Sequence, residues 1–186
     1  MRKLIRPIDY RNCNINLISS ILDYYGAIHQ YPTLKIVDEH LNRKYNNIVF
    51  IVLDGLGNKI LQKHSEFGIL NESKVAIIDS VYPPTTVAAI NSFESGLAPI
   101  EHGWLGWSLY FKEIDVTMDV FPEKNTITGE IVDLSQNNPK ELLSYKTIFT
   151  KIKEGTFDEV ERYRVYPSYI KSNVVDYNYV GVESIS

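Results

Sequence analysis

Apolar positions along this chain fall into helix-like spacings and short continuous runs, which turn residues separate. Between residues 14 and 25 they recur three and four positions apart, which predicts an amphipathic helix that Gly26 ends. Similar spacing predicts shorter helices at 36–41, 58–67, 85–93 and 148–153. Glycine commonly ends a helix, and we expect it to do so at Gly68, Gly96 and Gly155.

Two continuous apolar runs predict buried strands. Residues 48–53 read Ile-Val-Phe-Ile-Val-Leu without polar alternation, which is typical of a strand covered on both faces in a parallel sheet. A shorter run at 74–79 has the same character. With helices predicted between and after them, the order strand–helix–strand–helix indicates an α/β fold with a mainly parallel sheet.

The second half of the chain has a different pattern. Residues 108–133 scatter Val, Ile, Phe and Thr among turn residues, which predicts short antiparallel strands. Another strand is predicted at 163–166. The last stretch, 172–186, is rich in Tyr and Val and has no polar tail, so we expect it to belong to an incomplete domain.

Composition excludes some classes of partner. The 186 residues suffice for one domain with a core, and 44% of them are hydrophobic. The net charge of -4 argues against a nucleic-acid binder or a binder of anionic membranes, because both need a clustered basic face. A small anionic substrate remains open, because metal ions can supply positive charge locally.

Cysteine content and the N-terminal pattern predict the compartment. The single cysteine, Cys13, can form no internal disulfide, and no motif around it indicates a nucleophile, so we expect a structural thiol. The basic residues 1–7 precede no apolar run of signal-peptide length, and no stretch has the length of a membrane span. We therefore expect a cytoplasmic protein that does not contact the membrane.

Asp54 is the first candidate for chemistry. It directly follows the apolar run 48–53 and precedes Gly55 and Gly57. In open α/β sheets ligands gather at the carboxyl ends of strands, and a carboxylate there can face a metal ion while glycines turn the backbone. An ordinary strand-to-helix turn in which Asp54 caps the next helix would give the same pattern.

The second candidate is the segment 82–86, Tyr-Pro-Pro-Thr-Thr, which opens the helix predicted at 85–93. The first turn of a helix offers unpaired N–H groups and a positive dipole end, which suit a phosphate or an alkoxide. A plain threonine cap after two prolines is the alternative. If Asp54 and Thr86 face one crevice, a metal ion on Asp54 would lower the pKa of the Thr86 hydroxyl and activate it.

Two long segments resemble a known family. Residues 47–58 read NIVFIVLDGLGN, and residues 80–107 read SVYPPTTVAAINSFESGLAPIEHGWLGW. Together they resemble the N-terminal blocks of the type I phosphodiesterase/nucleotide pyrophosphatase family of the alkaline phosphatase superfamily. Those blocks are an apolar strand ending in Asp-Gly, then a Pro- and Thr-rich turn, a helix and Ser/Thr-Gly-x-x-Pro-x-x-His-Gly. Weaker resemblance extends through 147–154 and 165–173.

The resemblance implies a fold and a mechanism. The expected fold is α/β, an alkaline-phosphatase-like, mainly parallel sheet flanked by helices and truncated at its C-terminus. Residues 1–186 would be one partial catalytic domain, with a helical extension at 1–44 and a β insertion at 108–135. Asp54 would be a ligand of one of two divalent metal ions, usually zinc. Thr86 would contact the metal and act as the nucleophile, forming a phospho-threonine intermediate, with Thr85 as the neighbouring candidate.

The match to the family's site is incomplete. The family's other metal ligands, two aspartates and three histidines, lie downstream of the nucleophile helix, yet no histidine follows Trp107. We expect His102 to be structural and not a ligand. The remaining histidines lie upstream and are expected to be packing or surface residues: His29, His40 and His64. The chain alone is therefore expected to lack part of the two-metal site.

Three interpretations of function follow. The first is metal-dependent hydrolysis of phosphodiester, pyrophosphate or phosphomonoester bonds, with a small phosphate ester or nucleotide as substrate. The second is a related phosphatase, phosphonate hydrolase or sulfatase-like enzyme, although Thr86 disfavours a sulfatase, which carries a modified Cys or Ser there. The third is a non-catalytic scaffold that keeps the fold. The aromatic cluster Trp104, Trp107 and Tyr110 could line a stacking pocket, but we expect it to be core.

Overall fold

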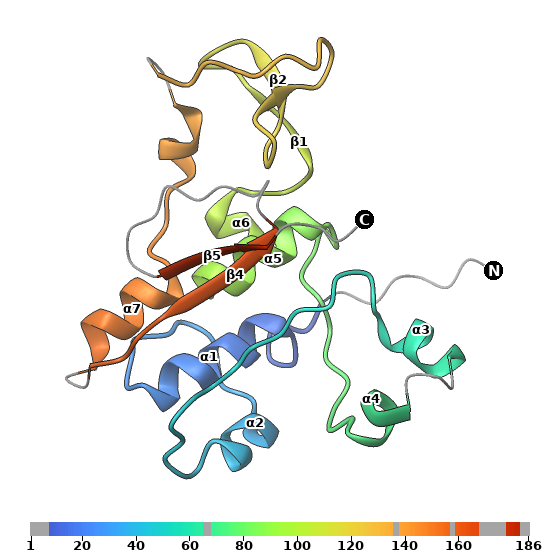
Figure 1. Cartoon of the computed structure of the whole chain (residues 1–186), viewed down its shortest axis with the longest axis vertical. Coiled ribbons are helices and arrows are strands. Elements are labelled where there is room, and N and C mark those ends of the chain that lie inside the picture. Colours follow the sequence, from blue (N-terminus) through green and yellow to red (C-terminus); the bar gives the residue numbers. More distant parts are fainter. Residues whose placement is uncertain (1–7, 65–67, 136–137, 157–158, 168–177, 183–186) are drawn as a thin grey trace.

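The computed structural model describes residues 8–64, 68–135, 138–156, 159–167 and 178–182 (Figure 1). These residues form a mixed fold of helices and strands, with a three-stranded antiparallel sheet and a two-stranded parallel sheet. None of the described helices combines the length and the apolar character needed to cross a membrane.

Most of the helices expected from apolar spacing are confirmed. Helices α1 and α2 correspond to the patterns at 14–25 and 36–41, α5 to that at 85–93 and α7 to that at 148–153. Their bounds and those of the short α6 are α1 (Asn14–Tyr24), α2 (Lys35–His40), α5 (Thr86–Ser95), α6 (Pro99–His102) and α7 (Ile148–Gly155).

The helix predicted at 58–67 is shorter than expected. Helix α3 (Asn58–Lys63) ends earlier, residues 65–67 lie outside the described part of the chain, and α4 (Gly68–Glu72) follows. The expectation that Gly68 ends a helix is therefore wrong, because Gly68 begins one. Gly96 does end α5: its φ of 67° is left-handed, and a Cβ there would lie 3.2 Å from Ile18 of α1.

Two of the three apolar clusters in the described residues join α1, α5, α7 and the antiparallel sheet. In the first, α1 packs against α7 and α5 through Ile18, Leu22, Ile152 and Phe93. In the second, Val87 at the start of α5 meets side chains that follow α6 and line the antiparallel sheet: Trp104, Phe111, Met118 and Val120. Helix α5 thus contributes to both clusters, and its N-terminal turn is fixed on the side of the antiparallel sheet.

The antiparallel strands expected in 108–133 are confirmed. Strand β1 (Ser108–Phe111) pairs with β2 (Val116–Asp119), which pairs with β3 (Lys124–Asn125) in the order β1-β2-β3. The strand expected at 163–166 is β4 (Tyr163–Pro167), which pairs in parallel with β5 (Asn178–Val182). The rest of the Tyr- and Val-rich end, 172–177 and 183–186, lies outside the described residues.

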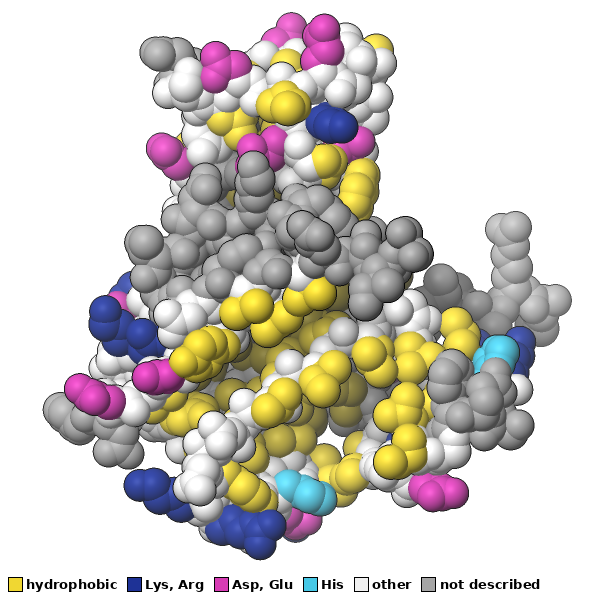
Figure 2. Space-filling view, viewed as in Figure 1, with side chains coloured by type: hydrophobic (Ala, Val, Ile, Leu, Met, Phe, Trp, Pro, Cys, Tyr) yellow, Lys and Arg dark blue, Asp and Glu magenta, His cyan; other side chains and the backbone are white. Residues whose placement is uncertain are grey.

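The prediction of paired strands at 48–53 and 74–79 is wrong for this structure. Neither segment forms a strand, and among the described residues the only bridge they form is a single parallel one between Asp79 and Cys13. Val49 is 79% exposed and Ile51 is 71% exposed. Figure 2 shows the resulting row of hydrophobic side chains on the surface. A buried strand needs neighbours on both edges, and the described residues supply none here.

Candidate functional site

The structure brings Asp54 and Thr86 together. The Thr86 hydroxyl donates to the Asp54 carboxylate, with Oγ1 3.3 Å from Oδ2 and 3.5 Å from Oδ1. The two residues lie 32 positions apart in the sequence, and both side chains are exposed. The two sequence motifs therefore meet in a direct contact between two solvent-exposed side chains.

A tight turn places the Asp54 carboxylate. The segment 48–53 leads into Asp54, and Gly55 then takes a left-handed φ of 73° that favours glycine. Within the turn, the N–H of Leu56 donates to the Leu53 carbonyl at 3.3 Å, and α3 begins directly afterwards. Asp54 thus stands where this segment ends and the chain reverses.

Thr85 and Thr86 have different roles at the start of α5. The Thr85 hydroxyl donates to the Leu105 carbonyl at 3.0 Å and accepts from the N–H of Ala88 at 3.2 Å, so it caps the helix. Thr86 is the first residue of α5, and its hydroxyl faces Asp54. Of the two neighbouring hydroxyls, only that of Thr86 points to a carboxylate, which agrees with the sequence assignment of Thr86 as the nucleophile candidate.

The first turn of α5 also has donors to offer. Within the described part of the chain, the N–H groups of Thr86 and Val87 donate to no acceptor. Both lie at the positive end of the helix dipole. A phosphate oxygen placed beside the Thr86 hydroxyl would therefore meet main-chain donors at the same place.

The described residues contain only part of a metal site. Asp54 and Thr86 together offer carboxylate and hydroxyl oxygens at one point, which suit a divalent ion. No group of three or more His, Cys, Asp or Glu side chains within the described residues could hold such an ion. Protein sites for zinc or magnesium use more ligands than these two residues provide.

His102 is structural, as the sequence analysis expected. The side chain is buried, its Nδ1 accepts from the N–H of Trp104 at 3.0 Å, and its Nε2 lies 3.0 Å from the hydroxyl of Ser92 in α5. Since Nδ1 accepts, the neutral ring carries its proton on Nε2, next to the Ser92 hydroxyl. Burial lowers the pKa of His102 from 6.5 to about 4.

The depressed pKa of His102 predicts acid sensitivity. The folded state protonates His102 less readily than the unfolded state does. The stability that neutral His102 contributes to the folded state is therefore fully present above pH 6.5 and is lost as the pH falls toward about 4. We expect the protonation of His102 to lower the free energy of unfolding by up to about 3 kcal/mol between these pH values. Urea unfolding of wild type and His102→Gln at pH 4.5 and 7.5 measures it. An equal pH dependence in both proteins would contradict the assignment.

The upstream histidines bind local groups. Nδ1 of His29 lies 2.8 Å from the Tyr31 carbonyl, and Nδ1 of His40 lies 2.7 Å from the Ile36 carbonyl. His64 is exposed and directly follows α3. The contacts of His29 and His40 fit the expectation of packing and surface roles.

The aromatic cluster divides into core and surface. Trp104 is buried, and its Nε1–H donates to the Leu143 carbonyl at 3.1 Å, as expected for core. Trp107 and Tyr110 are exposed, so for them the expectation of core is wrong.

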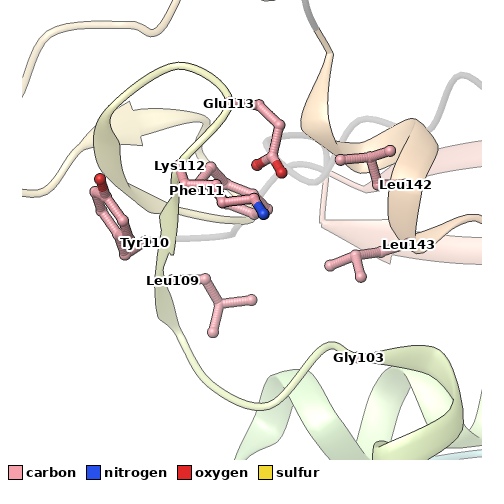
Figure 3. A pocket seen from close by; sticks show the side chains of 8 residues that line it. All are labelled: Gly103, Leu109, Tyr110, Phe111, Lys112, Glu113, Leu142 and Leu143. Atoms are coloured by element: carbon pink, nitrogen blue, oxygen red, sulfur yellow. The ribbon is translucent and has the colours of Figure 1, made fainter.

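An open pocket of about 490 Å³ lies between β1 and the 3₁₀ helix Pro139–Leu143 (Figure 3). Its lining residues do not include Asp54 or Thr86, so this pocket is not part of the Asp54–Thr86 contact.

Cys13 is a structural thiol. Its side chain is fully buried in the cluster with Ile15, Val81 and Ala88, and burial raises its pKa. A buried thiol with a raised pKa is a poor nucleophile, which confirms the interpretation from sequence.

A buried polar cluster was not foreseen from the sequence. Glu94, in the last turn of α5, forms an ion pair with Arg164 of β4 and accepts from the hydroxyls of Tyr145 and Tyr166, each at 3.2 Å. The Arg164 guanidinium also lies 4.0 Å from the centre of the Tyr166 ring. Glu94 and Arg164 lie 70 residues apart, and no local pattern marks either of them as a partner.

Comparison of the chain with protein-family models, with curated proteins and with solved structures gave no significant match.

Proposed function

We propose that this chain carries the nucleophile-bearing part of a metal-dependent hydrolase of phosphodiester, pyrophosphate or phosphomonoester bonds. The observation that supports it is the contact of the Thr86 hydroxyl with the Asp54 carboxylate at 3.3 Å, at the first turn of α5. The likeness of residues 47–58 and 80–107 to the type I phosphodiesterase/nucleotide pyrophosphatase family supports the same conclusion. On this proposal, an alkaline-phosphatase-like parallel sheet would form around residues 48–53 in the complete catalytic unit.

Asp54, Thr86 and the main chain at the start of α5 have different roles in the proposed phosphoryl transfer. Asp54 orients the Thr86 hydroxyl by accepting its hydrogen bond, and the Thr86 oxygen attacks phosphorus. The bond to the ester oxygen breaks, and that oxygen leaves with the electron pair and takes up the proton that the Thr86 hydroxyl gives up, so the phosphoryl group is carried on Thr86. The free N–H groups of Thr86 and Val87 stabilise the negative charge on the phosphoryl oxygens. Water then attacks the same phosphorus, releases phosphate from a monoester substrate or a phosphate monoester from a diester, and leaves a proton on the Thr86 oxygen.

Asp54 and Thr86 would hold one of the metal ions. A divalent ion there supplies charge that lowers the pKa of the hydroxyl and neutralises the phosphate. Within the described residues no group of three or more His, Cys, Asp or Glu side chains could hold an ion, so on this proposal further ligands would come from outside them. A non-catalytic scaffold is the alternative, and its support is that no histidine follows Trp107 in this sequence.

Metal affinity tests the role of Asp54. Calorimetric titration of the chain with Zn²⁺ or Mn²⁺ should show weak binding. Asp54→Asn should lower the affinity for the ion by at least about tenfold, because the carboxylate loses its charge while the side chain keeps its shape. Asp133→Asn is the matched control, since Asp133 is an exposed carboxylate that accepts from the N–H of Ser135. Equal loss in both variants, or no loss in Asp54→Asn, would contradict the metal site.

Turnover by the isolated chain is a second test of the same proposal. With Zn²⁺ or Mn²⁺ and a chromogenic phosphodiester, we expect a rate close to the uncatalysed one, because two-metal chemistry needs both ions in place. Fast turnover that Asp54→Asn abolishes would show that the chain already holds a complete site. Fast turnover that Asp54→Asn leaves unchanged would contradict the proposed site itself.

A further inference from the structure

We propose that Tyr145 is a positioning residue for the Thr86 hydroxyl and that it acts through Asn91. Tyr145 lies between the 3₁₀ helix Pro139–Leu143 and α7, while Asn91 and Thr86 belong to α5. This role rests on the proposed function and deepens it, because it names the side chains that fix where the nucleophile points. It is a positioning role, since the Tyr145 hydroxyl bonds to Asn91 and Glu94 and reaches Thr86 only through the helix.

The contact between Thr86 and Asp54 tolerates little displacement. Its oxygen–oxygen distances of 3.3 and 3.5 Å are long for an O–H···O hydrogen bond. Asp54 stands on a turn outside α5, so moving the first turn of the helix away by about 0.3 Å would break the bond. Both side chains are exposed, so the main chain of each segment has to fix their positions.

A chain of hydrogen bonds connects Tyr145 with the first turn of α5. The Tyr145 hydroxyl donates to Oδ1 of Asn91 at 2.5 Å, and Nδ2 of Asn91 donates to the Val87 carbonyl at 2.8 Å. The same hydroxyl lies farther from Glu94, at 3.2 Å, so Asn91 is its main acceptor. Asn91 is only 9% exposed, so water competes little for these bonds. Because Val87 directly follows Thr86, the chain of bonds ends beside the nucleophile.

Tyr145 determines which way the Asn91 amide faces. A hydroxyl that donates needs the amide oxygen opposite it, so Nδ2 of Asn91 is turned to the Val87 carbonyl. Without that hydroxyl, a rotation of the amide by about 180° would place its oxygen against the carbonyl, where two acceptors repel each other. Tyr145 is itself held in place. Its ring lies 6.2 Å from that of His102, and it packs against the apolar cluster that contains Val87.

Tyr166 of β4 is a natural comparison for Tyr145. The hydroxyls of both tyrosines donate to Glu94, each at 3.2 Å. Among the described residues, only the hydroxyl of Tyr145 also bonds to Asn91. Removal of either hydroxyl therefore takes one donor from Glu94, but only the change at Tyr145 frees the Asn91 amide.

The side-chain torsion χ1 of Thr86 tests the proposal. In NMR spectra of the labelled chain, the three-bond couplings of the Thr86 Cγ2 carbon to the main-chain nitrogen and carbonyl carbon report χ1, and so the direction of the hydroxyl. We expect wild type to show the couplings of a single rotamer. Tyr145→Phe, which keeps the ring, should give couplings averaged over several rotamers. Tyr166→Phe is the matched control and should keep the wild-type couplings.

A double-mutant cycle tests the route through Asn91. Asn91→Leu removes the amide at nearly constant size and should average the Thr86 couplings as Tyr145→Phe does. Adding Tyr145→Phe to Asn91→Leu should change them no further, because the tyrosine then has no amide to orient. Near-ultraviolet circular dichroism checks that each variant is folded. If Tyr145→Phe is unfolded, Asn91→Leu measured against Tyr166→Phe decides alone.

Several results would overturn the proposal. They are wild-type couplings in folded Tyr145→Phe or Asn91→Leu, couplings that are already averaged in wild type, and a double variant in which the two effects add. Equal averaging in Tyr166→Phe would assign the effect to the surroundings of Glu94 instead. The couplings are measured without metal or substrate. A failure of metal binding or turnover would therefore contradict the proposed function and leave the measured link between Tyr145 and Thr86 unchanged.

Discussion

Replacing Thr86 by alanine is expected to lower kcat/KM for a phosphodiester by at least about 10³-fold, because the step then has no nucleophile. The loss should show both in the complete catalytic unit and in any residual turnover of this chain with Zn²⁺ or Mn²⁺. Thr86→Ser should keep part of the activity, since a hydroxyl remains beside Asp54.

Thr85 is the control for this experiment. Its hydroxyl bonds to the Leu105 carbonyl and to the N–H of Ala88, so Thr85→Ala removes a helix cap and costs about 1 kcal/mol of stability. Turnover should fall much less than in Thr86→Ala. Intact-mass detection of a phosphoryl adduct on Thr86 after acid quench gives a second readout. If Thr85→Ala is inactive and Thr86→Ala is not, the two roles are exchanged. If neither substitution matters, the covalent mechanism is wrong.

Arg164→Met is expected to be the most destabilising of the substitutions considered, with a loss of about 3 kcal/mol of unfolding free energy. The side chains of Arg164 and Glu94 are only 12% and 19% exposed, so the change leaves a buried carboxylate without its cation. Arg11→Met is the control, because Arg11 pairs with Asp9 at the surface and should cost little. Urea unfolding at pH 7 measures both.

The pH dependence and a double variant test the cause of that loss. Burial raises the pKa of the Glu94 carboxyl, and Arg164 together with Tyr145 and Tyr166 opposes that shift. Without Arg164, no cation opposes the raised pKa of Glu94. Protonation of Glu94 then removes the cost of burying its negative charge. The difference in the free energy of unfolding between wild type and Arg164→Met should therefore become smaller as the pH falls toward 4.5, the ordinary pKa of a glutamate. Adding Glu94→Gln should restore part of the stability at pH 7. A gap that is constant with pH and insensitive to Glu94→Gln would assign the loss to packing.

Elements specified by local sequence could be predicted, and elements specified by distant pairing could not. Helix α5 follows from apolar spacing between a threonine cap and Gly96, and the turns before and after β3 follow from Pro122 and Gly129. The apolar run 48–53 predicts a buried strand, which the structure does not form. Whether that segment is paired depends on strands elsewhere, and no local pattern reports their presence.

The candidate site shows the same division. Asp54 and Thr86 could be named in advance because each stands at the end of a strongly patterned element, and the contact at 3.3 Å joins them. Glu94 looks from the sequence like any helix-end glutamate. Its burial arises only when β4 crosses α5, a contact between parts of the chain that the sequence does not relate.

Helix α5 connects the Asp54–Thr86 contact with the cluster around Glu94 and Arg164. Its ten residues form a rod about 15 Å long that carries Thr86 at one end and Phe93 with Glu94 at the other. Val87 and Ala88 in its first turn are fully buried, so packing holds α5 at both ends. On the proposed function, the attack on phosphorus would tolerate a misplacement of only about 1 Å. The core packing of α5 would then set the position of the Thr86 oxygen together with its contact to Asp54.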